Sequence, residues 1–173
     1  GVFKAYETRV GNGPMPTEFN DNDEAESELC RSVRETGREY GVTTGRARRC
    51  GYLDLVALKY ACQVNSIDSL VLTHLDIYDP MEQIEACIAY DINGKIVTDF
   101  PAGIEDLENA KPVLQKFEGW KTPLKDVRKY SKLPRNARNY IEFIEDYCHV
   151  PVDIISVGYE RDQTFIRKNP WKK

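Results

Sequence analysis

The feature that most constrains the fold is an almost wholly apolar run, Ser-Leu-Val-Leu-Thr, at residues 69–73. Such a short apolar run is typical of a central strand that is buried in a sheet. A second run, Asp-Ile-Ile-Ser-Val-Gly at residues 153–158, also reads as a buried strand and ends in small residues. Because helical patterns alternate with such strands along the chain, we expect an α/β fold.

The rest of the chain supplies further helices and strands. Apolar residues recur at helical spacing in three stretches, which predicts helices at 24–39, 55–64 and 134–147, and a short helix is expected at 104–110. A polar cluster at residues 20–23 can cap the first of these helices. Further strands are expected at 2–10, 83–90, 95–97 and 113–117, with Asn93-Gly94 as a tight hairpin turn.

Composition narrows the class of protein. The chain has 173 residues, a length that suits one domain with a proper core. Its 24 Lys+Arg and 28 Asp+Glu give a net charge of −4, which argues against general nucleic-acid binding. No apolar run approaches the roughly 20 residues that cross a bilayer, so no membrane association is expected.

The cysteines and histidines exclude an ordinary zinc or iron site. The five cysteines are widely spaced with no Cys-x-x-Cys pair, and the two histidines lack the spacing of metal ligands. The cysteines are therefore expected to be reduced core thiols of a cytoplasmic protein. The start of the chain has no Met and no signal peptide, and it reads as a strand entered midway, which suggests a piece of a longer protein.

The stretch at residues 41–51 concentrates groups that bind anions. It holds two threonines, three glycines and the arginines Arg46, Arg48 and Arg49. Threonine hydroxyls donate hydrogen bonds, and each arginine offers a planar fork that matches carboxylate or phosphate oxygens. Three close arginines are costly unless anions share their charge, so small anions are the favoured ligands. A solvated basic loop and an RNA-binding loop are the alternatives.

A second candidate site follows the apolar strand at residues 69–73. There Asp76 can accept two hydrogen bonds from neighbouring N–H donors of guanine, while His74 lies along the face of the base. Adenine lacks that pair of donors and would leave the carboxylate unpaired. The alternative is an ordinary capping Asp beside a half-buried His.

A series of segments resembles the adenylosuccinate synthetase family, in the order that this family has them. They lie at residues 4–11, 13–18, 40–49, 50–54, 73–76, 112–120, 139–141 and 155–158. The resemblance implies the C-terminal part of a larger mixed sheet flanked by helices, similar to that of P-loop NTPases, and a single region over the whole chain. It also implies an enzyme that joins IMP and L-aspartate to give adenylosuccinate, while GTP becomes GDP and phosphate. The resemblance further implies Mg²⁺ as a cofactor, a homodimer and a cytoplasmic location.

The resemblance also assigns roles to individual residues. The implied aspartate loop consists of Val42, Thr43, Thr44, Gly45, Arg46, Ala47 and Arg48. The residues implied for IMP are Arg46 and Val10. Those implied for GTP are Arg48, His74, Leu75, Asp76, Ser156, Val157 and Gly158. Nucleic acid is not an expected partner, and a stand-alone anion- or nucleic-acid-binding module using the Arg46–Arg49 stretch is the alternative function.

Two departures from the family pattern matter. His74 stands where the family has Lys; an imidazole can stack on guanine but carries no permanent charge. In addition, the family's glycine-rich phosphate loop, its Mg²⁺-binding aspartate and its catalytic histidine have no counterpart in these residues. We therefore expect no catalytic residue and no metal ligand in this chain, and no activity from the chain alone.

Overall fold

The computed structural model describes residues 1–169 and has the predicted α/β character. Its helices and strands form two compact units, each of which draws on separate stretches of the chain. The first unit comprises Gly1–Ala5, Ala57–Glu85 and the described residues from Lys116 on; the second comprises Tyr6–Val56 and Ala86–Gln115. Within residues 1–169, no helix combines the length and the apolar character needed to cross a membrane.

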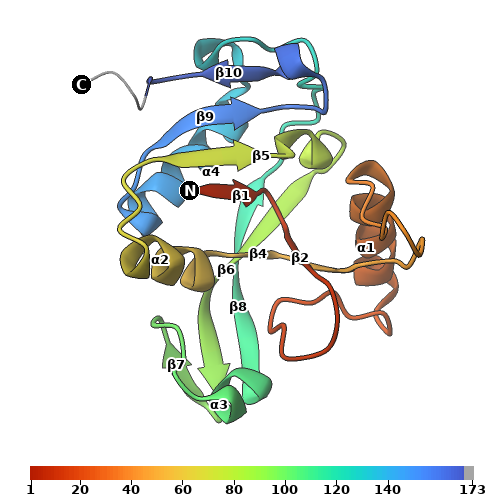
Figure 1. Cartoon of the computed structure of the whole chain (residues 1–173), viewed down its shortest axis with the longest axis vertical. Coiled ribbons are helices and arrows are strands. Elements are labelled where there is room, and N and C mark those ends of the chain that lie inside the picture. Colours follow the sequence, from red (N-terminus) through yellow and green to blue (C-terminus); the bar gives the residue numbers. More distant parts are fainter. Residues whose placement is uncertain (170–173) are drawn as a thin grey trace. The chain divides into compact units, whose positions relative to one another are not determined.

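A four-stranded sheet forms the centre of the first unit. Its strands lie in the order β1 (Val2–Lys4), β5 (Leu70–Thr73), β9 (Val152–Ser156) and β10 (Thr164–Ile166), as Figure 1 shows. Strands β1 and β9 both run parallel to β5, and β10 runs antiparallel to β9. The two apolar runs are thus strands as predicted: β5 is central in the sheet, and every residue of β9 is buried.

Two helices belong largely to this unit, and both were predicted. Helix α2 spans Leu55–Val64, and helix α4 spans Arg135–Cys148 with Pro134 at its N-cap. The buried face of α4 consists of Ala137, Tyr140, Ile141, Ile144 and Cys148. The sequence pattern did not predict three short 3₁₀ helices, which are η1 (Leu75–Tyr78), η2 (Tyr130–Lys132) and η3 (Arg161–Gln163).

Two small sheets belong wholly or mostly to the second unit. In one, β2 (Glu7–Arg9) pairs antiparallel with β3 (Arg49–Gly51). The other contains β4 (Leu53–Asp54), β6 (Gln83–Ile92), β7 (Lys95–Val97) and β8 (Ala110–Glu118). The predicted hairpin turn between β6 and β7 is confirmed, because Asn93 and Gly94 adopt φ of 54° and 83°, the left-handed values that such a turn requires.

The helices of the second unit are α1 (Glu24–Thr36) and α3 (Ile104–Asn109). The carboxylate of Asp23 caps α1 by accepting a hydrogen bond from the Glu26 amide at 3.0 Å, so the cap lies in the predicted polar cluster. Helix α1 ends at Thr36 and not at residue 39, because Gly37 forms its C-cap. Glu39 therefore lies outside the helix.

The single strand predicted at residues 2–10 is wrong. Ala5 and Tyr6 are consecutive and both buried, with 0% and 2% of their surfaces exposed. Neighbouring side chains of a straight strand point to opposite faces, so the chain bends here to bury both. Residues 2–4 join one sheet as β1, and residues 7–9 join another as β2.

A buried hydrogen-bonded pair, Tyr90 and Asp54, offers a test of the packing of the second unit. Tyr90 is fully buried and donates its hydroxyl hydrogen to Asp54, whose side chain is buried beside it. Tyr90→Phe removes that donor from a buried carboxylate and is expected to lower the free energy of unfolding by about 2 kcal/mol. Urea denaturation measures the change, with Tyr159→Phe at an exposed tyrosine as the control. Equal effects of the two substitutions would contradict this account.

Candidate functional site

The predicted aspartate loop forms a closed turn on the second unit. Tyr40 and Ala47 form an isolated β-bridge at its base. Within the turn, the Gly45 amide donates to the Gly41 carbonyl and the Gly41 amide donates to the Arg46 carbonyl, both at 2.8 Å. Residues 42–46 are all exposed, and Val42 at the tip is 99% exposed although it is apolar.

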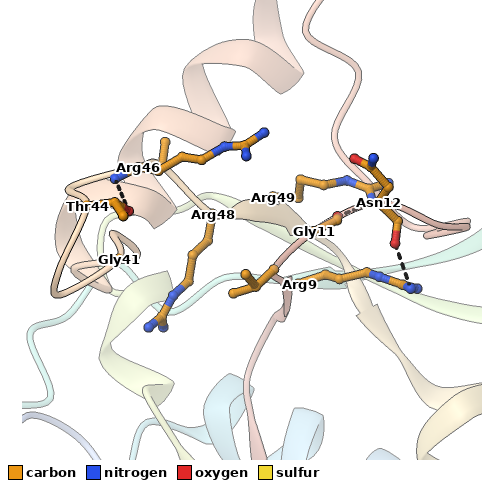
Figure 2. Close-up of a pocket in the computed structure, with 10 residues that line it drawn as sticks. Arg9, Gly11, Asn12, Gly41, Thr44, Arg46, Arg48 and Arg49 are labelled. Atoms are coloured by element: carbon orange, nitrogen blue, oxygen red, sulfur yellow. Dashed lines mark hydrogen bonds between the residues drawn. The ribbon is translucent and has the colours of Figure 1, made fainter.

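A pocket of about 180 Å³ lies beside this turn (Figure 2). It is lined by Arg9, Val10, Gly11, Asn12, Gly41, Thr44, Arg46, Ala47, Arg48 and Arg49. The structure thus places Val10 in one pocket with four residues of the loop, although the two segments are far apart in sequence. The loop residues Val42, Thr43 and Gly45 do not line it.

Arg46 is the arginine of this pocket with an uncommitted side chain. Its guanidinium group is exposed and makes no hydrogen bond or ion pair to any of residues 1–169. Its backbone is fixed, because the Arg46 amide donates to the Thr44 hydroxyl at 3.3 Å. In Figure 2 the guanidinium groups of Arg46 and Arg48 point in different directions, so the two arginines present their donors to different places.

Arg48 is held by a carboxylate of its own chain. Its Nη1 donates to Oε2 of Glu39 at 2.8 Å, and the Glu39 side chain is only 1% exposed. The Nε of Arg48 is buried and has no hydrogen-bond partner among the described residues. Glu39 therefore engages Nη1 of the guanidinium, while Nε keeps an unused N–H donor within residues 1–169.

Arg9 and Arg49 hold the loop that carries Val10. Arg9 donates to the carbonyls of Pro14 and Asn12 at 2.6 and 3.0 Å. Arg49 donates to the carbonyls of Gly11 and Gly13 at 3.1 and 2.8 Å. Figure 2 shows both side chains extending towards this loop, so they shape the wall of the pocket that Val10 lines.

Arg49 also forms a two-point ion pair with Glu18, at 2.7 and 2.6 Å. Hydrogen bonding to this carboxylate raises the pKa of Arg49 above its ordinary value. The expectation that external anions share all three arginine charges is therefore wrong. Glu39 and Glu18 partner Arg48 and Arg49, and Arg46 alone of the three has no such partner among the described residues.

The two predicted guanine segments lie together in the first unit. Strands β5 and β9 are parallel neighbours, with Leu72 opposite Ile155, so residues 74–76 and 156–158 follow the same edge of the sheet. At this edge His74 adopts a left-handed backbone with φ of 58°, and Leu75 begins η1. Ligands of open α/β sheets collect at the carboxyl ends of parallel strands.

Asp76 lies in η1, and one oxygen of its carboxylate lacks a hydrogen-bond donor. Its Oδ1 is buried and has no hydrogen-bond partner among residues 1–169. Burial raises the pKa of the Asp76 carboxyl above its ordinary value, and a hydrogen bond from its own backbone and the nearby His74 oppose this in part. An unpaired buried acceptor is costly, so this oxygen is suited to a donor that a ligand brings.

The second guanine segment is ordered by η3. The Val157 amide donates to the Gln163 carbonyl at 3.0 Å, and the Gln163 side chain accepts from the Glu160 amide at 2.9 Å. The Ser156 hydroxyl donates to the Gly158 carbonyl at 2.8 Å. The segment is a fixed turn after β9, and no sequence signal had indicated the role of Gln163.

Asp79 was also missed by sequence reasoning. Its carboxylate accepts from the Trp120 indole at 3.0 Å and from the Leu124 amide at 2.8 Å. Burial raises the pKa of Asp79 as well, and the nearby Asp76 carboxylate adds to the shift. Asp79 thus ties the loop around Trp120 to the same short helix that carries Asp76.

The described residues do not supply a cluster of metal ligands. Across residues 1–169, no three His, Cys, Asp or Glu side chains gather where they could hold a metal ion. The described residues therefore do not fit a Mg²⁺ site, and no chemical step is assigned to a metal held by this chain.

Comparison with known proteins places this geometry in a family. The adenylosuccinate synthetase family model matches residues 1–165. The adenylosuccinate synthetase of Caldanaerobacter subterraneus is 48% identical over 169 residues, which are 98% of this chain and 38% of that protein. The Aquifex aeolicus enzyme is 48% identical over 94% of this chain and 36% of its own length.

A solved structure agrees with the sequence relatives. The fully ligated adenylosuccinate synthetase of Plasmodium falciparum superposes with a TM-score of 0.87 at 38% identity, covering 96% of this chain and 39% of that one. The chain therefore spans about two-fifths of the length of the relatives that it matches. Since the family model covers nearly the whole chain, the chain belongs to the adenylosuccinate synthetase family.

Proposed function

We propose that this chain is part of an enzyme that joins IMP and L-aspartate to form adenylosuccinate with consumption of GTP. GTP phosphorylates the 6-oxygen of IMP, and the aspartate amine then displaces that phosphate. The chain's share is to bind and orient: the loop at residues 42–48 takes aspartate, Val10 and Arg46 contact IMP, and Arg48 reaches aspartate and GTP. It corresponds to the C-terminal region of the enzyme.

The observation that carries this proposal is the unpaired carboxylate oxygen of Asp76. It is buried at the carboxyl end of the central strand β5, beside the turn that follows β9. Guanine presents two adjacent N–H donors on one edge, which match the two oxygens of a carboxylate. His74 lies two residues before Asp76, and its proposed role is to stack on the base.

The uncommitted Arg46 supports the aspartate and IMP assignment. A guanidinium with no partner among residues 1–169, next to exposed threonines, suits a ligand carboxylate or phosphate. Val10 is 78% exposed and lines the same pocket, so it offers an apolar surface to a purine base. The loop's exposed position suits closure over bound aspartate.

The remaining machinery is proposed to lie outside this chain. We assign the phosphate loop, the Mg²⁺ ligands, the general base and the catalytic histidine to the rest of the enzyme. The enzyme is proposed to act in the cytoplasm as a homodimer, with Mg²⁺ as its cofactor. Positioning and charge neutralisation by the metal supply most of phosphoryl-transfer catalysis, so this chain alone lacks what the reaction needs.

The alternative of a nucleic-acid-binding module has less support. Such a module needs several free cations that track a phosphate backbone. Arg48 and Arg49 are paired with Glu39 and Glu18, which leaves Arg46 as the unpaired arginine of this stretch within residues 1–169. The family match does not favour this alternative either.

Reconstitution tests the proposal. The chain alone, supplied with IMP, L-aspartate, GTP and Mg²⁺, is expected to form no adenylosuccinate. Co-expression with the complementary part of an adenylosuccinate synthetase is expected to restore product, measured by chromatography, and omission of any one substrate should abolish it. Product from the chain alone would contradict the assignment of the catalytic groups to the rest of the enzyme. An assembled pair that forms no product would contradict the proposed function.

A further inference from the structure

We propose that Glu39 is a positioning residue that fixes Arg48 as a static hydrogen-bond donor to ligand oxygens. The inference rests on the proposed function, which makes Arg48 a ligand of aspartate and GTP. It assigns different behaviour to the two arginines of the loop. Arg46 brings a mobile charge, whereas Arg48 brings donors in a fixed place.

Glu39 is a fully buried carboxylate, with 0% of the residue exposed. Burying a charge is expensive unless it is paired and hydrogen-bonded. Its oxygens accept hydrogen bonds from the hydroxyls of Tyr6 and Thr8 and from Nη1 of Arg48. Since Tyr6 is itself buried, its hydrogen bond fixes the Glu39 carboxylate that holds Arg48.

The backbone of Arg48 is fixed from two further directions. Its amide donates to the Glu39 carbonyl at 2.9 Å, so Glu39 holds Arg48 through both its main chain and its side chain. Its carbonyl accepts from Nε of Arg34, in helix α1, at 3.1 Å. The start of the Arg48 side chain and one end of its guanidinium are therefore both constrained.

The pairing leaves useful donors. Only Nη1 is engaged by Glu39, and the Arg48 side chain is still 31% exposed. Nη2 makes no hydrogen bond to any of residues 1–169. A guanidinium whose orientation is set in advance loses less rotational freedom when a ligand binds, which is a gain in affinity by pre-organisation.

Rotation of the guanidinium groups tests the proposal without ligand. In the full 173-residue chain, ¹⁵N exchange NMR is expected to show rotation about the Arg48 Nε–Cζ bond at least about 10-fold slower than that of Arg46. Glu39→Gln should remove this difference, whereas Glu18→Gln, which neutralises the neighbouring Arg49 pair, should not. Equal rotation of Arg46 and Arg48 in the unaltered chain would overturn the proposal, even if Glu39→Gln failed to fold.

Kinetics of the reconstituted enzyme supply the second readout. Glu39→Gln is expected to raise the KM for L-aspartate about 10-fold and to leave the KM for IMP within about 2-fold. A merely structural role would raise both values together, and that result would overturn the positioning role. Arg48→Ala, measured in parallel, distinguishes a wrong function for Arg48 from a wrong positioning role for Glu39. If Arg48→Ala leaves the aspartate KM unchanged, the proposed function of Arg48 is wrong; if only Glu39→Gln leaves it unchanged, the positioning role is wrong.

Discussion

Replacing Asp76 with asparagine is expected to weaken GTP binding to the reconstituted enzyme by about 100-fold. Aspartate offers two acceptors to the two N–H donors of guanine, whereas asparagine offers one acceptor and an opposing donor. A charge-assisted hydrogen bond contributes about 1.5–3 kcal/mol, and a loss near 2.7 kcal/mol corresponds to about 100-fold in the dissociation constant. Equilibrium titration with GTP measures the change.

Comparison with ITP sharpens this test, because ITP lacks the 2-amino group of GTP. The unaltered enzyme should prefer GTP over ITP, and Asp76→Asn should reduce that preference. Asp68→Asn is the matched control, since Asp68 is exposed and belongs to the same unit. If the unaltered enzyme bound GTP and ITP equally, Asp76 would not read the guanine edge.

The same substitution has an opposite effect on stability. Burial raises the pKa of Asp76 in the folded chain above its ordinary value of 3.8. The folded chain therefore holds this proton more tightly than the unfolded chain. The resulting stabilisation is fully present below about pH 3.8 and is lost as the pH rises through the raised pKa. At neutral pH the unaltered chain carries a poorly solvated charge that Asp76→Asn removes.

Asp76→Asn is thus expected to raise the free energy of unfolding at pH 7 by about 1 kcal/mol, and this gain should shrink towards pH 4. Urea denaturation at several pH values follows it, and Asp68→Asn should show no such trend. A substitution that costs binding while it adds stability is the pattern expected of a residue kept for function. A loss of stability at pH 7 that does not vary with pH would contradict this explanation.

The elements that the sequence predicted best are those with a long apolar pattern. Helix α2 was predicted with its observed bounds, and α4 differs from its prediction by one residue at each end. Strands β3, β4 and β10 were missed because they have two or three residues, too few for an alternation to appear. Strand β7 is as short, but the Asn93-Gly94 turn before it indicated a hairpin. The bend at Ala5–Tyr6 was missed because burial of both side chains depends on partners far along the chain.

The candidate site, too, could be predicted only in part from the sequence. Its position after a buried strand was visible in the sequence, because the apolar run at β5 ends two residues before Leu75. The partners of the arginines were not visible. Glu39 and Glu18 lie 9 and 31 residues from the arginines that they bind, and no local pattern indicates such pairs. The roles of the loop residues in binding remain predictions.

Replacing Gly119 with alanine is expected to destabilise the first unit by about 3 kcal/mol, near the upper end for an overpacked site. A Cβ at Gly119 would lie 1.9 Å from the Met81 carbonyl oxygen and 2.9 Å from the Glu82 carbonyl carbon. Both obstacles are backbone atoms, which cannot rotate away as a side chain can. The Gly119 amide also donates to the Glu82 carbonyl at 2.8 Å, and that bond holds the two segments together.

Gly103→Ala is the matched control, because a Cβ there meets only the Asp106 carboxylate, at 3.6 Å. Its effect should stay within about 0.5 kcal/mol, since an alanine cap is slightly worse but restricts the unfolded chain. Trp120 follows Gly119 and donates its indole hydrogen to Asp79, so its fluorescence should shift in Gly119→Ala before global unfolding. Because Asp79 forms the C-cap of η1, the helix that carries Asp76, the displaced loop should also weaken GTP binding in the reconstituted enzyme. If Gly119→Ala were as stable as Gly103→Ala, the backbone contact at Met81 would not constrain this loop.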